Sequence, residues 1–445
     1  MRKLRGIRTP HHKNTAGMET EIMPIPAEVC IPMSMHTGAP AKPVVKAGDA
    51  VKVGQLIGEA AGAVSAPVHA SVSGTVKSVD GYNEVTGQKS ESVTISADGL
   101  QTPFAEPTPV NVADIGEFLA AVRNSGLVGL GGAGFPTAVK LTVGDSAKLD
   151  YIIINGAECE PYITSDTRTM IEDAELIHDG IALLKRFFNA AVIIGIESNK
   201  KEPIERMQKI AADLSGVEVR ALPAMYPQGG EKVLIYNITG RAVPEGGLPL
   251  DVGVIVLNCT TLAALARYIR TGMPLVSKRV TVDGPAVKQP KNLLVPIGTR
   301  IGELLDYCGC DRETVKKALY GGPMMGLAVP NLDVPVLKST NAIVAFTAAE
   351  ASLPGETACI RCGVCASNCP MGLMTMEIER SFLLKKPELL DHYKVNLCME
   401  CGCCAYNCPA RRPLVQSIKL GKIMLREHQA ALKAEQEKKS AKEAG

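Results

Sequence analysis

The sequence contains no tryptophan, and aromatic residues make up only 4% of its 445 residues. The net charge is only +2, which gives no electrostatic indication of binding to nucleic acid or to an anionic surface. No run of about 18 uninterrupted apolar residues occurs, so we predict no membrane span. Basic residues near the N-terminus are not followed by an apolar run, so we expect no signal peptide.

Hydrophobic residues make up 46% of the chain, enough for substantial cores, and the length predicts about three domains. The 14 cysteines are the most informative residue type. Six of them show no paired spacing that predicts a disulfide framework: Cys30, Cys159, Cys259, Cys308, Cys310 and Cys403. Because free thiolates require a reducing compartment, we expect a cytoplasmic location.

The other eight cysteines form two runs with the same spacing, C-x2-C-x2-C-x3-C-P. The first run comprises Cys359, Cys362, Cys365, Cys369 and Pro370, and the second comprises Cys398, Cys401, Cys404, Cys408 and Pro409. This spacing is typical of proteins with two [4Fe–4S] clusters, in which the fourth cysteine of each run binds the other cluster. We therefore predict one cluster on Cys359, Cys362, Cys365 and Cys408, and another on Cys398, Cys401, Cys404 and Cys369.

Zinc is a weaker interpretation, because it needs only four thiolates and usually takes two separated C-x2-C pairs. Cys403 interrupts the second run, but Cys404 fits the spacing, so we interpret Cys403 as a spare thiol. The runs predict an α-helical two-[4Fe–4S] ferredoxin domain over residues 355–425, stabilised largely by its clusters. Residues 427–445 form a charged tail, expected to be a frayed helix or disordered.

Residues 1–110 are predicted to be a β-rich barrel-sandwich domain, because short alternating strands are separated by glycine and aspartate. The pattern resembles the lipoyl carrier fold, without the lysine context that such carriers modify. Residues 111–275 are predicted to be an α/β domain. A helix is expected over 111–124, and apolar strands over 151–154, 191–196, 217–222 and 252–257 alternate with helices over 178–188, 202–212 and 231–238.

A glycine-rich stretch, Gly129-Leu-Gly-Gly-Ala-Gly-Phe-Pro-Thr137, lies near the start of the α/β domain. Clustered glycines allow backbone N–H groups to approach a phosphate, although the pattern fits neither a P-loop nor G-x-G-x-x-G. On its own this loop is equally well explained as a structural turn. A second stretch, Asn155-Gly-Ala-Glu-Cys-Glu-Pro161, follows a predicted strand, where ligands of open α/β sheets bind.

These two stretches, together with Tyr226-Pro-Gln-Gly-Gly-Glu231, resemble the FMN- and NADH-binding flavin subunit of respiratory complex I. The lipoyl-like domain and the two cysteine runs make this resemblance more specific. The full order resembles the RnfC/RsxC family of the Rnf-type ion-translocating ferredoxin:NAD+ oxidoreductases. The resemblance implies a multidomain α+β architecture, in which a β-grasp-type (SLBB) domain occupies residues 276–350.

The resemblance also implies a set of residues for non-covalent FMN and for NAD(H) as substrate. Glycines and a lysine would hold phosphate, Phe135 would stack on a ring of NADH, and the remaining residues would line the flavin and nicotinamide site. The set is Gly129, Gly131, Gly132, Gly134, Phe135, Lys140, Asn155, Glu158, Glu160, Glu231 and Asn258. Leu130, Ala157 and Gly230 depart from the complex I pattern, which has charged residues there. No catalytic acid or base is expected, because hydride transfer does not require one.

Within residues 276–350, a helix is expected over 301–307. Gly321–Gly326 and the methionines within it could be interpreted as a nucleotide loop or as ligands, but we expect a plain turn and packing residues.

The resemblance implies an electron-transfer subunit at the NAD end of a membrane complex. It would be peripheral at the cytoplasmic face, beside an iron–sulfur subunit and membrane-embedded subunits, with no nucleic-acid partner. Two alternatives stay open: the flavin subunit of a soluble hydrogenase or bifurcating complex, and an electron-wire scaffold without flavin.

Overall fold

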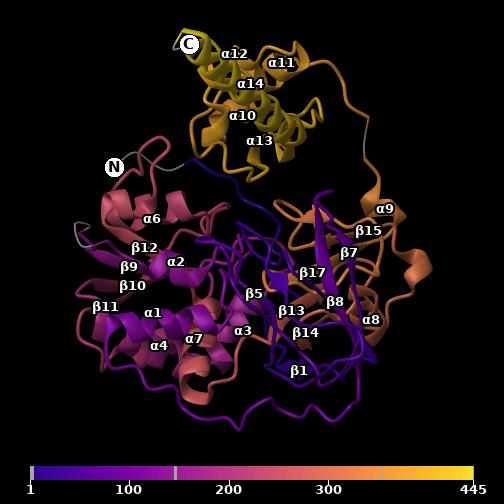
Figure 1. Cartoon of the computed structure of the whole chain (residues 1–445). Coiled ribbons are helices and arrows are strands. Elements are labelled where there is room, and N and C mark those ends of the chain that lie inside the picture. Colours follow the sequence, from indigo (N-terminus) through magenta and orange to yellow (C-terminus); the bar gives the residue numbers. More distant parts are fainter. Residues whose placement is uncertain (1–4, 145–147, 354, 444–445) are drawn as a thin grey trace.

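The computed structural model describes residues 5–144, 148–353 and 355–443. The chain forms four modules in the predicted order, which confirms the mixed multidomain fold class (Figure 1). No helix within the described ranges is long and apolar enough to cross a membrane.

The barrel module consists of two small antiparallel sheets packed around a shared apolar core. One sheet has the order β2-β8-β7-β4 and the other β3-β5-β6. The strands are β2 (Glu28–Pro32), β3 (Lys42–Pro43), β4 (Ala50–Val51), β5 (Leu56–Glu59), β6 (Val68–His69), β7 (Gly74–Asn83) and β8 (Lys89–Ala97).

The α/β module is built on a four-stranded parallel sheet with the order β11-β10-β9-β12. Its strands are β9 (Tyr151–Asn155), β10 (Ala191–Glu197), β11 (Val217–Leu222) and β12 (Val254–Asn258). The central strands are buried on both faces, as at Ile152 and Ile153. This burial explains why their sequences are continuous apolar runs. Each fully buried aliphatic side chain contributes about 1.5–3 kcal/mol to folding.

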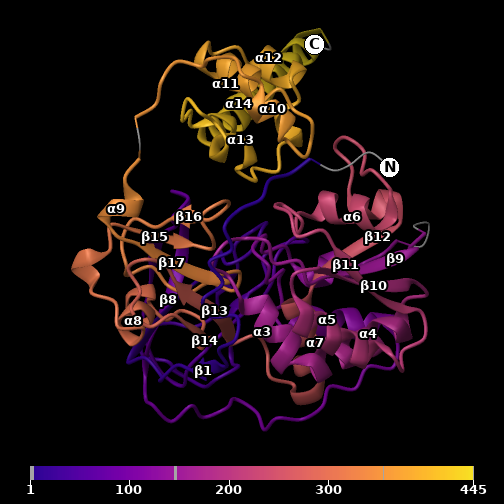
Figure 2. The same ribbon diagram turned by 180° about the vertical axis from the view of Figure 1, so that it is seen from behind.

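Helices cover both faces of this sheet (Figures 1 and 2). They are α1 (Ile115–Asn124), α2 (Thr137–Leu141), α3 (Ser165–Glu172), α4 (Ala174–Phe187), α5 (Lys201–Ala211), α6 (Glu231–Thr239) and α7 (Cys259–Thr271), with a 3₁₀ turn over Pro249–Val252. The helix expected from residue 111 begins at Ile115, because the Asp114 side chain accepts a hydrogen bond from the backbone N–H of Glu117 and caps it.

The mixed-sheet module has six strands in the order β1-β14-β13-β17-β15-β16. Its elements are β1 (Thr20–Ile22), β13 (Ser277–Asp283), β14 (Lys291–Pro296), α8 (Ile301–Tyr307), β15 (Lys317–Tyr320), β16 (Leu327–Ala328) and β17 (Ala342–Phe346), with a 3₁₀ turn over Arg312–Thr314. Strand β1 pairs in parallel with β14. The stretch expected as one module over residues 1–110 is therefore divided, because its first strand completes a distant sheet.

The helical module follows α9 (Ala348–Ala351) and a connector. It contains α10 (Val364–Ser367), α11 (Thr375–Leu383), α12 (Pro387–His392), α13 (Cys403–Tyr406) and α14 (Leu414–Glu443), with a 3₁₀ turn over Val395–Leu397. The expected charged tail is part of α14 as far as Glu443.

Two buried lysines join the modules around the glycine-rich loop. Lys338 of the mixed-sheet module donates to the carbonyls of Pro67 in the barrel module and Gly126 in the α/β module, at 2.6 and 2.7 Å. Lys278 in β13 donates to the carbonyl of Leu130 at 2.8 Å. Burial lowers the pKa of Lys338 to about 7 and that of Lys278 to about 8. The loop and the chain that leads into it are thus held by the mixed-sheet module.

Candidate functional site

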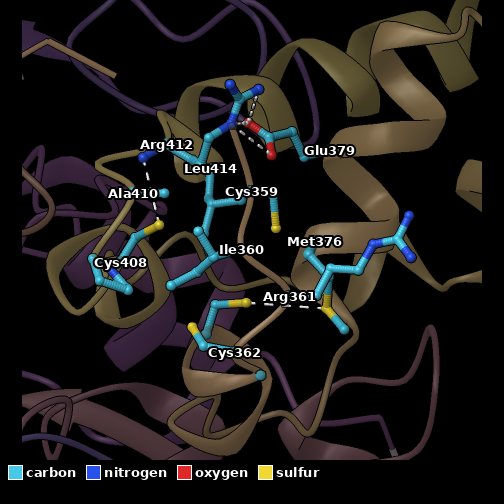
Figure 3. A pocket seen from close by; sticks show the side chains of 13 residues that line it. Cys359, Ile360, Arg361, Cys362, Met376, Glu379, Cys408, Ala410, Arg412 and Leu414 are labelled. Atoms are coloured by element: carbon cyan, nitrogen blue, oxygen red, sulfur yellow. Dashed lines mark hydrogen bonds and ion pairs between the residues drawn. The ribbon is translucent and has the colours of Figure 1, made fainter. Parts of the chain in front are cut away.

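Two cavities in the helical module are lined by the cysteines of the two runs. The first is lined by Cys359, Cys362, Cys365 and Cys408. In Figure 3, the labelled Cys359, Cys362 and Cys408 surround a common space next to the Arg412–Glu379 pair. Cys359 and Cys362 are exposed to solvent. This cavity therefore lies at the surface of the module.

The second cavity is lined by Cys369, Cys398, Cys401 and Cys404. The fourth cysteine of each run thus lies with the first three of the other run, which is the crossed arrangement that the spacing predicts. Cys403 also lines this second cavity, and its thiol lies 4.0 Å from the carbonyl oxygen of Tyr226. The assignment of individual cysteines as ligands, and of Cys403 as a spare thiol, stays a prediction.

Each cavity is lined by four cysteines of the two runs, the number of thiolates that one [4Fe–4S] cluster needs. Among the described residues, no group of three histidine, cysteine or acidic side chains is placed to hold a single metal ion. Backbone N–H groups of Glu400 and Arg412 lie 3.3 and 3.5 Å from the sulfurs of Cys398 and Cys408. Such donors stabilise negative charge on sulfur and tune cluster potentials.

The glycine-rich loop is closed on itself and leaves donors free at its tip. The N–H of Gly129 donates to the carbonyl of Phe135, and the N–H of Gly134 donates to the carbonyl of Gly129. Gly131, Gly132 and Ala133 are exposed, and within the described ranges their backbone N–H groups have no protein acceptor. Such a loop suits an anion.

Other modules fix the loop from outside. In the barrel module, the backbone N–H and the side-chain hydroxyl of Thr37 donate to the carbonyls of Gly134 and Ala133. A Cβ atom on Gly131 would lie 3.0 Å from the amide nitrogen of Asn258, so glycine allows this close approach. The Leu130 side chain is 1% exposed, so it packs in the core and does not reach the loop surface.

Asn155 and Asn258 lie side by side at the carboxyl edge of the sheet, because β9 and β12 pair with these residues in register. Asn155 donates to the carbonyl of Gly229 and accepts from the N–H of Ala157. Asn258 caps α7 and donates to Asp166. This edge is where ligands bind in open α/β sheets, and both amides shape it through contacts with protein.

The carboxylate of Glu158 is buried and is engaged by protein donors. It accepts from the N–H of Asp166 at 2.7 Å, from the hydroxyl of Thr167 at 2.7 Å, and from the ammonium of Lys200 at 2.9 Å. Burial raises the pKa of Glu158, but the charges of Lys200 and Lys13 outweigh burial and lower it. Glu158 therefore holds the start of α3 and the loop after β9.

The carboxylate of Glu160 contacts the mixed-sheet module. Its two oxygens accept from the backbone N–H groups of Met324 and Met325, at 3.1 and 2.7 Å. Burial raises the pKa of Glu160 to about 7, against the opposing effect of these two donors. The turn at residues 321–326 thus holds Glu160, which agrees with its interpretation as a turn.

Lys140 and Glu231 meet at the edge of the glycine-rich loop. The ammonium of Lys140 lies 2.8 Å from the carboxylate of Glu231 and 3.2 Å from the carbonyl of Val256. Both side chains are about one-third exposed, at 30% and 39%. Phe135, which follows the loop tip in the sequence, is half-buried. Lys140 is therefore accessible to a phosphate.

Sequence reasoning missed Lys13 as a residue that shapes this site. Lys13 donates to the carbonyls of Glu158, Glu160 and Ile163, at 2.9, 2.7 and 2.5 Å. Burial and the charge of Lys200 lower the pKa of Lys13 to about 8. A lone lysine in a polar stretch carries no periodicity or spacing that would predict such a contact.

Comparison with known proteins agrees with this geometry. Family models match four stretches in order: the RnfC barrel sandwich hybrid domain over residues 2–100, the Nuo51 FMN-binding domain over 122–267, the SLBB domain over 279–328, and a 4Fe-4S dicluster domain over 358–411. These domains define an FMN- and [4Fe–4S]-carrying electron-transfer protein.

Curated relatives cover most of the chain. The C component of the proton-translocating ferredoxin:NAD(+) oxidoreductase complex of Clostridium ljungdahlii is 43% identical over 81% of this chain and 80% of the relative. Its Na(+)-translocating counterpart of Acetobacterium woodii is 42% identical over 84% of this chain and 85% of the relative. The C component of the ion-translocating oxidoreductase complex of Rhodobacter capsulatus is 42% identical over 96% of this chain and 83% of the relative.

The chain therefore belongs to the RnfC family of the ion-translocating ferredoxin:NAD+ oxidoreductases. The resemblance seen in the sequence, and FMN and [4Fe–4S] clusters as cofactors, are confirmed. A solved NAD+-reducing [NiFe]-hydrogenase is 20% identical, with a TM-score of 0.49 over 68% of this chain and 63% of that chain, and is too distant to inform function.

The two neighbouring cysteines of the second cavity give a first prediction. Cys404→Ser is expected to lower the iron content from about eight to about four atoms per chain, because one cubane loses a ligand. Cys403→Ser is the matched control and is expected to keep about eight. Iron and sulfide assays on anaerobically purified protein measure both. Equal iron loss in the two variants would contradict the ligand assignment.

The raised pKa of Glu160 gives a second prediction. Between the ordinary value of 4.5 and about 7 the folded protein holds this proton more tightly than the unfolded chain does, so stability falls as pH rises through this window. Glu160→Gln has no carboxyl group at this position, so its stability does not fall for this reason. The free energy of unfolding of the variant, relative to that of the unaltered protein, should be about 1 to 3 kcal/mol higher above pH about 7 than at low pH.

Thermal unfolding midpoints of the two proteins across this pH window measure the difference. Glu175→Gln alters an exposed carboxylate on α4 and is expected to track the unaltered protein. Parallel curves for Glu160→Gln and the unaltered protein would show that Glu160 does not titrate in this window.

Proposed function

We propose that this subunit exchanges hydride between NAD(H) and FMN at the edge of the parallel sheet, and passes single electrons through the helical module to partner subunits. Bound FMN would supply the conversion between an electron pair, taken or given as hydride, and the single electrons that [4Fe–4S] clusters carry. The observation that carries the proposal is the joint presence of the glycine-rich loop and the two cysteine-lined cavities in one chain.

The chain's own residues bind and orient the cofactor. The backbone N–H groups of Gly131, Gly132 and Ala133, which have no acceptor in the part of the chain that the structure describes, are donors suited to phosphate oxygens. Lys140 supplies a positive charge at the same edge, where it now pairs with Glu231. No side chain needs to donate or accept a proton, because hydride transfer requires no acid or base.

The positions of the two cavities suggest an order of electron transfer. The second cavity, lined by Cys369, Cys398, Cys401 and Cys404, lies next to the α/β module, because the Tyr226 hydroxyl donates to the carbonyl of Cys401 at 2.6 Å. The first cavity opens to solvent at Cys359 and Cys362. The cysteines of the second cavity would therefore hold the cluster nearer the flavin site, and those of the first cavity the cluster nearer a partner subunit.

The partners we propose are an iron–sulfur subunit and membrane-embedded subunits of the same complex. The relatives are named as subunits of ion-translocating complexes, which supports membrane association through partners. We place this chain at the cytoplasmic face, where NAD(H) is available and thiolates remain reduced.

The alternatives are less well supported. The names of the relatives do not favour a soluble hydrogenase or bifurcating complex. A scaffold without flavin was suggested by Leu130, Ala157 and Gly230. Leu130 and Ala157 are buried, and a Cβ on Gly230 would lie 2.2 Å from the methyl carbon of Met399. These residues therefore fit the packing of this chain, so their presence does not indicate a lost flavin site.

An anaerobic experiment on the purified chain tests the proposal. We expect about eight irons, one non-covalent FMN, and bleaching of both flavin and cluster absorbance on addition of NADH. An intact iron content with no flavin, and no bleaching even after FMN is supplied, would leave an electron wire. Fractionation of native membranes tests the location, since a soluble complex would remain in the supernatant.

Lys140 gives a prediction specific to the flavin site. Lys140→Met is expected to weaken FMN binding about 10- to 100-fold, because a hydrogen bond to a charged group contributes about 1.5–3 kcal/mol. Lys209→Met, at an exposed position on α5, is the control and should leave the FMN Kd unchanged. Titration of the apoprotein with FMN by fluorescence measures both. An unchanged Kd in Lys140→Met would remove this lysine from the site.

A further inference from the structure

The helical module is joined to the body of the molecule by the connector after α9 (Figures 1 and 2). Modules joined in this way move relative to one another unless an interface holds them. Electron transfer between modules is fast only while their redox centres lie close together. The contacts that dock the helical module decide whether its second cavity stays beside the α/β module. The N-terminal segment supplies several of these contacts.

The N-terminal segment runs between the body and the helical module. Its residue Ile7 forms an isolated antiparallel bridge with Tyr226, in which each backbone N–H donates to the other's carbonyl at 2.9 Å. Arg5 donates to the carbonyl of Ala366 in the helical module at 3.2 Å. One short stretch therefore contacts both modules.

Tyr226 of this bridge also contacts the second cysteine run. Tyr226 is 2% exposed, and its hydroxyl donates to the carbonyl of Cys401. Ile7, Tyr226, Cys401 and Cys403 form one buried apolar cluster, against which Met324 and Met399 pack. A ligand-bearing loop of the helical module is thereby seated on the Ile7–Tyr226 bridge.

The other end of the segment is anchored in the α/β module. Lys13 donates to three carbonyls of the loop after β9. The ring of His12 stacks on Tyr162 with centroids 4.9 Å apart, and the carbonyl of His11 accepts from the N–H of Tyr162 at 3.0 Å. The segment is fixed to the body by polar contacts that do not involve the helical module.

We propose that residues 5–16, here called the clasp, are a docking element that positions the second cysteine cavity against the α/β module, with Ile7 and Tyr226 as the positioning residues. This inference rests on the proposed function only for the consequence of docking, which is rapid electron transfer between the flavin and the nearer cluster. Its structural role, the docking itself, is testable separately.

A substitution at Gly6 is a small change that would disrupt the bridge between Ile7 and Tyr226. A Cβ atom at Gly6 would lie 2.6 Å from the backbone carbonyl oxygen of Tyr226, so Gly6→Ala forces the clasp away from its partner. Gly17 lies just beyond the clasp, and a Cβ there meets nothing within 4 Å. Gly17→Ala is the matched control, because it makes the same chemical change without a clash.

Both variants are prepared as the full chain with iron and FMN contents equal to those of the unaltered protein. Anaerobic stopped-flow mixing with NADH follows flavin and cluster absorbance separately. In Gly6→Ala we expect flavin bleaching at the unaltered rate and cluster bleaching slower by about tenfold or more, because small displacements of reacting groups have large effects on rate. Gly17→Ala should match the unaltered protein in both phases.

Hydrogen exchange gives a readout that does not depend on electron transfer. Peptides that cover residues 5–13 and 224–230 contain the paired amides of Ile7 and Tyr226. In Gly6→Ala these amides should exchange about tenfold faster or more, while Gly17→Ala leaves them unchanged. Unaltered exchange together with unaltered cluster bleaching in Gly6→Ala would overturn the proposal.

Tyr226→Phe provides a second variant that keeps the apolar packing and removes only the hydroxyl that donates to Cys401. It should slow cluster bleaching less than Gly6→Ala does and leave the amide of Ile7 protected. If NADH fails to bleach the flavin of the unaltered protein, the proposed function fails. The exchange rates of the amides in Gly6→Ala still decide whether the Ile7–Tyr226 bridge holds the clasp to the α/β module.

Discussion

The ammonium group of Lys13 is the point on which the site depends. It donates to three backbone carbonyls in the loop after β9, where a loop without regular structure offers no backbone partners of a helix or sheet. The same loop is held by Glu158 through Lys200 and by Glu160 through the mixed-sheet module. A segment that lacks secondary structure is thereby made rigid at the edge of the sheet where a ligand binds.

This arrangement separates the residues that shape the site from those available to a ligand. The carboxylates of Glu158 and Glu160 are already occupied by N–H, hydroxyl and ammonium donors. Lys140 and the tip of the glycine-rich loop keep accessible charge and donors. An acidic loop beside a site for an anionic cofactor would be unfavourable if its charges were unpaired. Lys200 pairs with Glu158, and burial raises the pKa of Glu160 to about 7, which reduces its negative charge at neutral pH.

Local patterns in the sequence predicted the features that depend on spacing and periodicity. The parallel strands were identifiable as apolar runs, and β11 and α8 occupy the predicted residues. The crossed arrangement of the cysteines followed from cubane chemistry. The roles of Lys13 and of the turn that holds Glu160 were not predictable, because they depend on contacts between modules far apart in the sequence. For the same reason the sequence assigns residues 20–22 to the barrel module with the rest of 1–110, whereas they form β1 and complete the sheet of another module.

The path of the N-terminal segment has a consequence for the order in which the chain folds. During synthesis this segment emerges well before its partners. The carbonyl of Thr15 accepts from Asn292, a residue 277 positions later, and Arg5 donates to a carbonyl 361 positions later. The segment cannot adopt its final conformation until those partners have been made. Contacts of such long sequence separation form slowly, since the entropy of closing the intervening chain is lost before they are made. Residues that leave the ribosome early are thus among the last to reach their native positions.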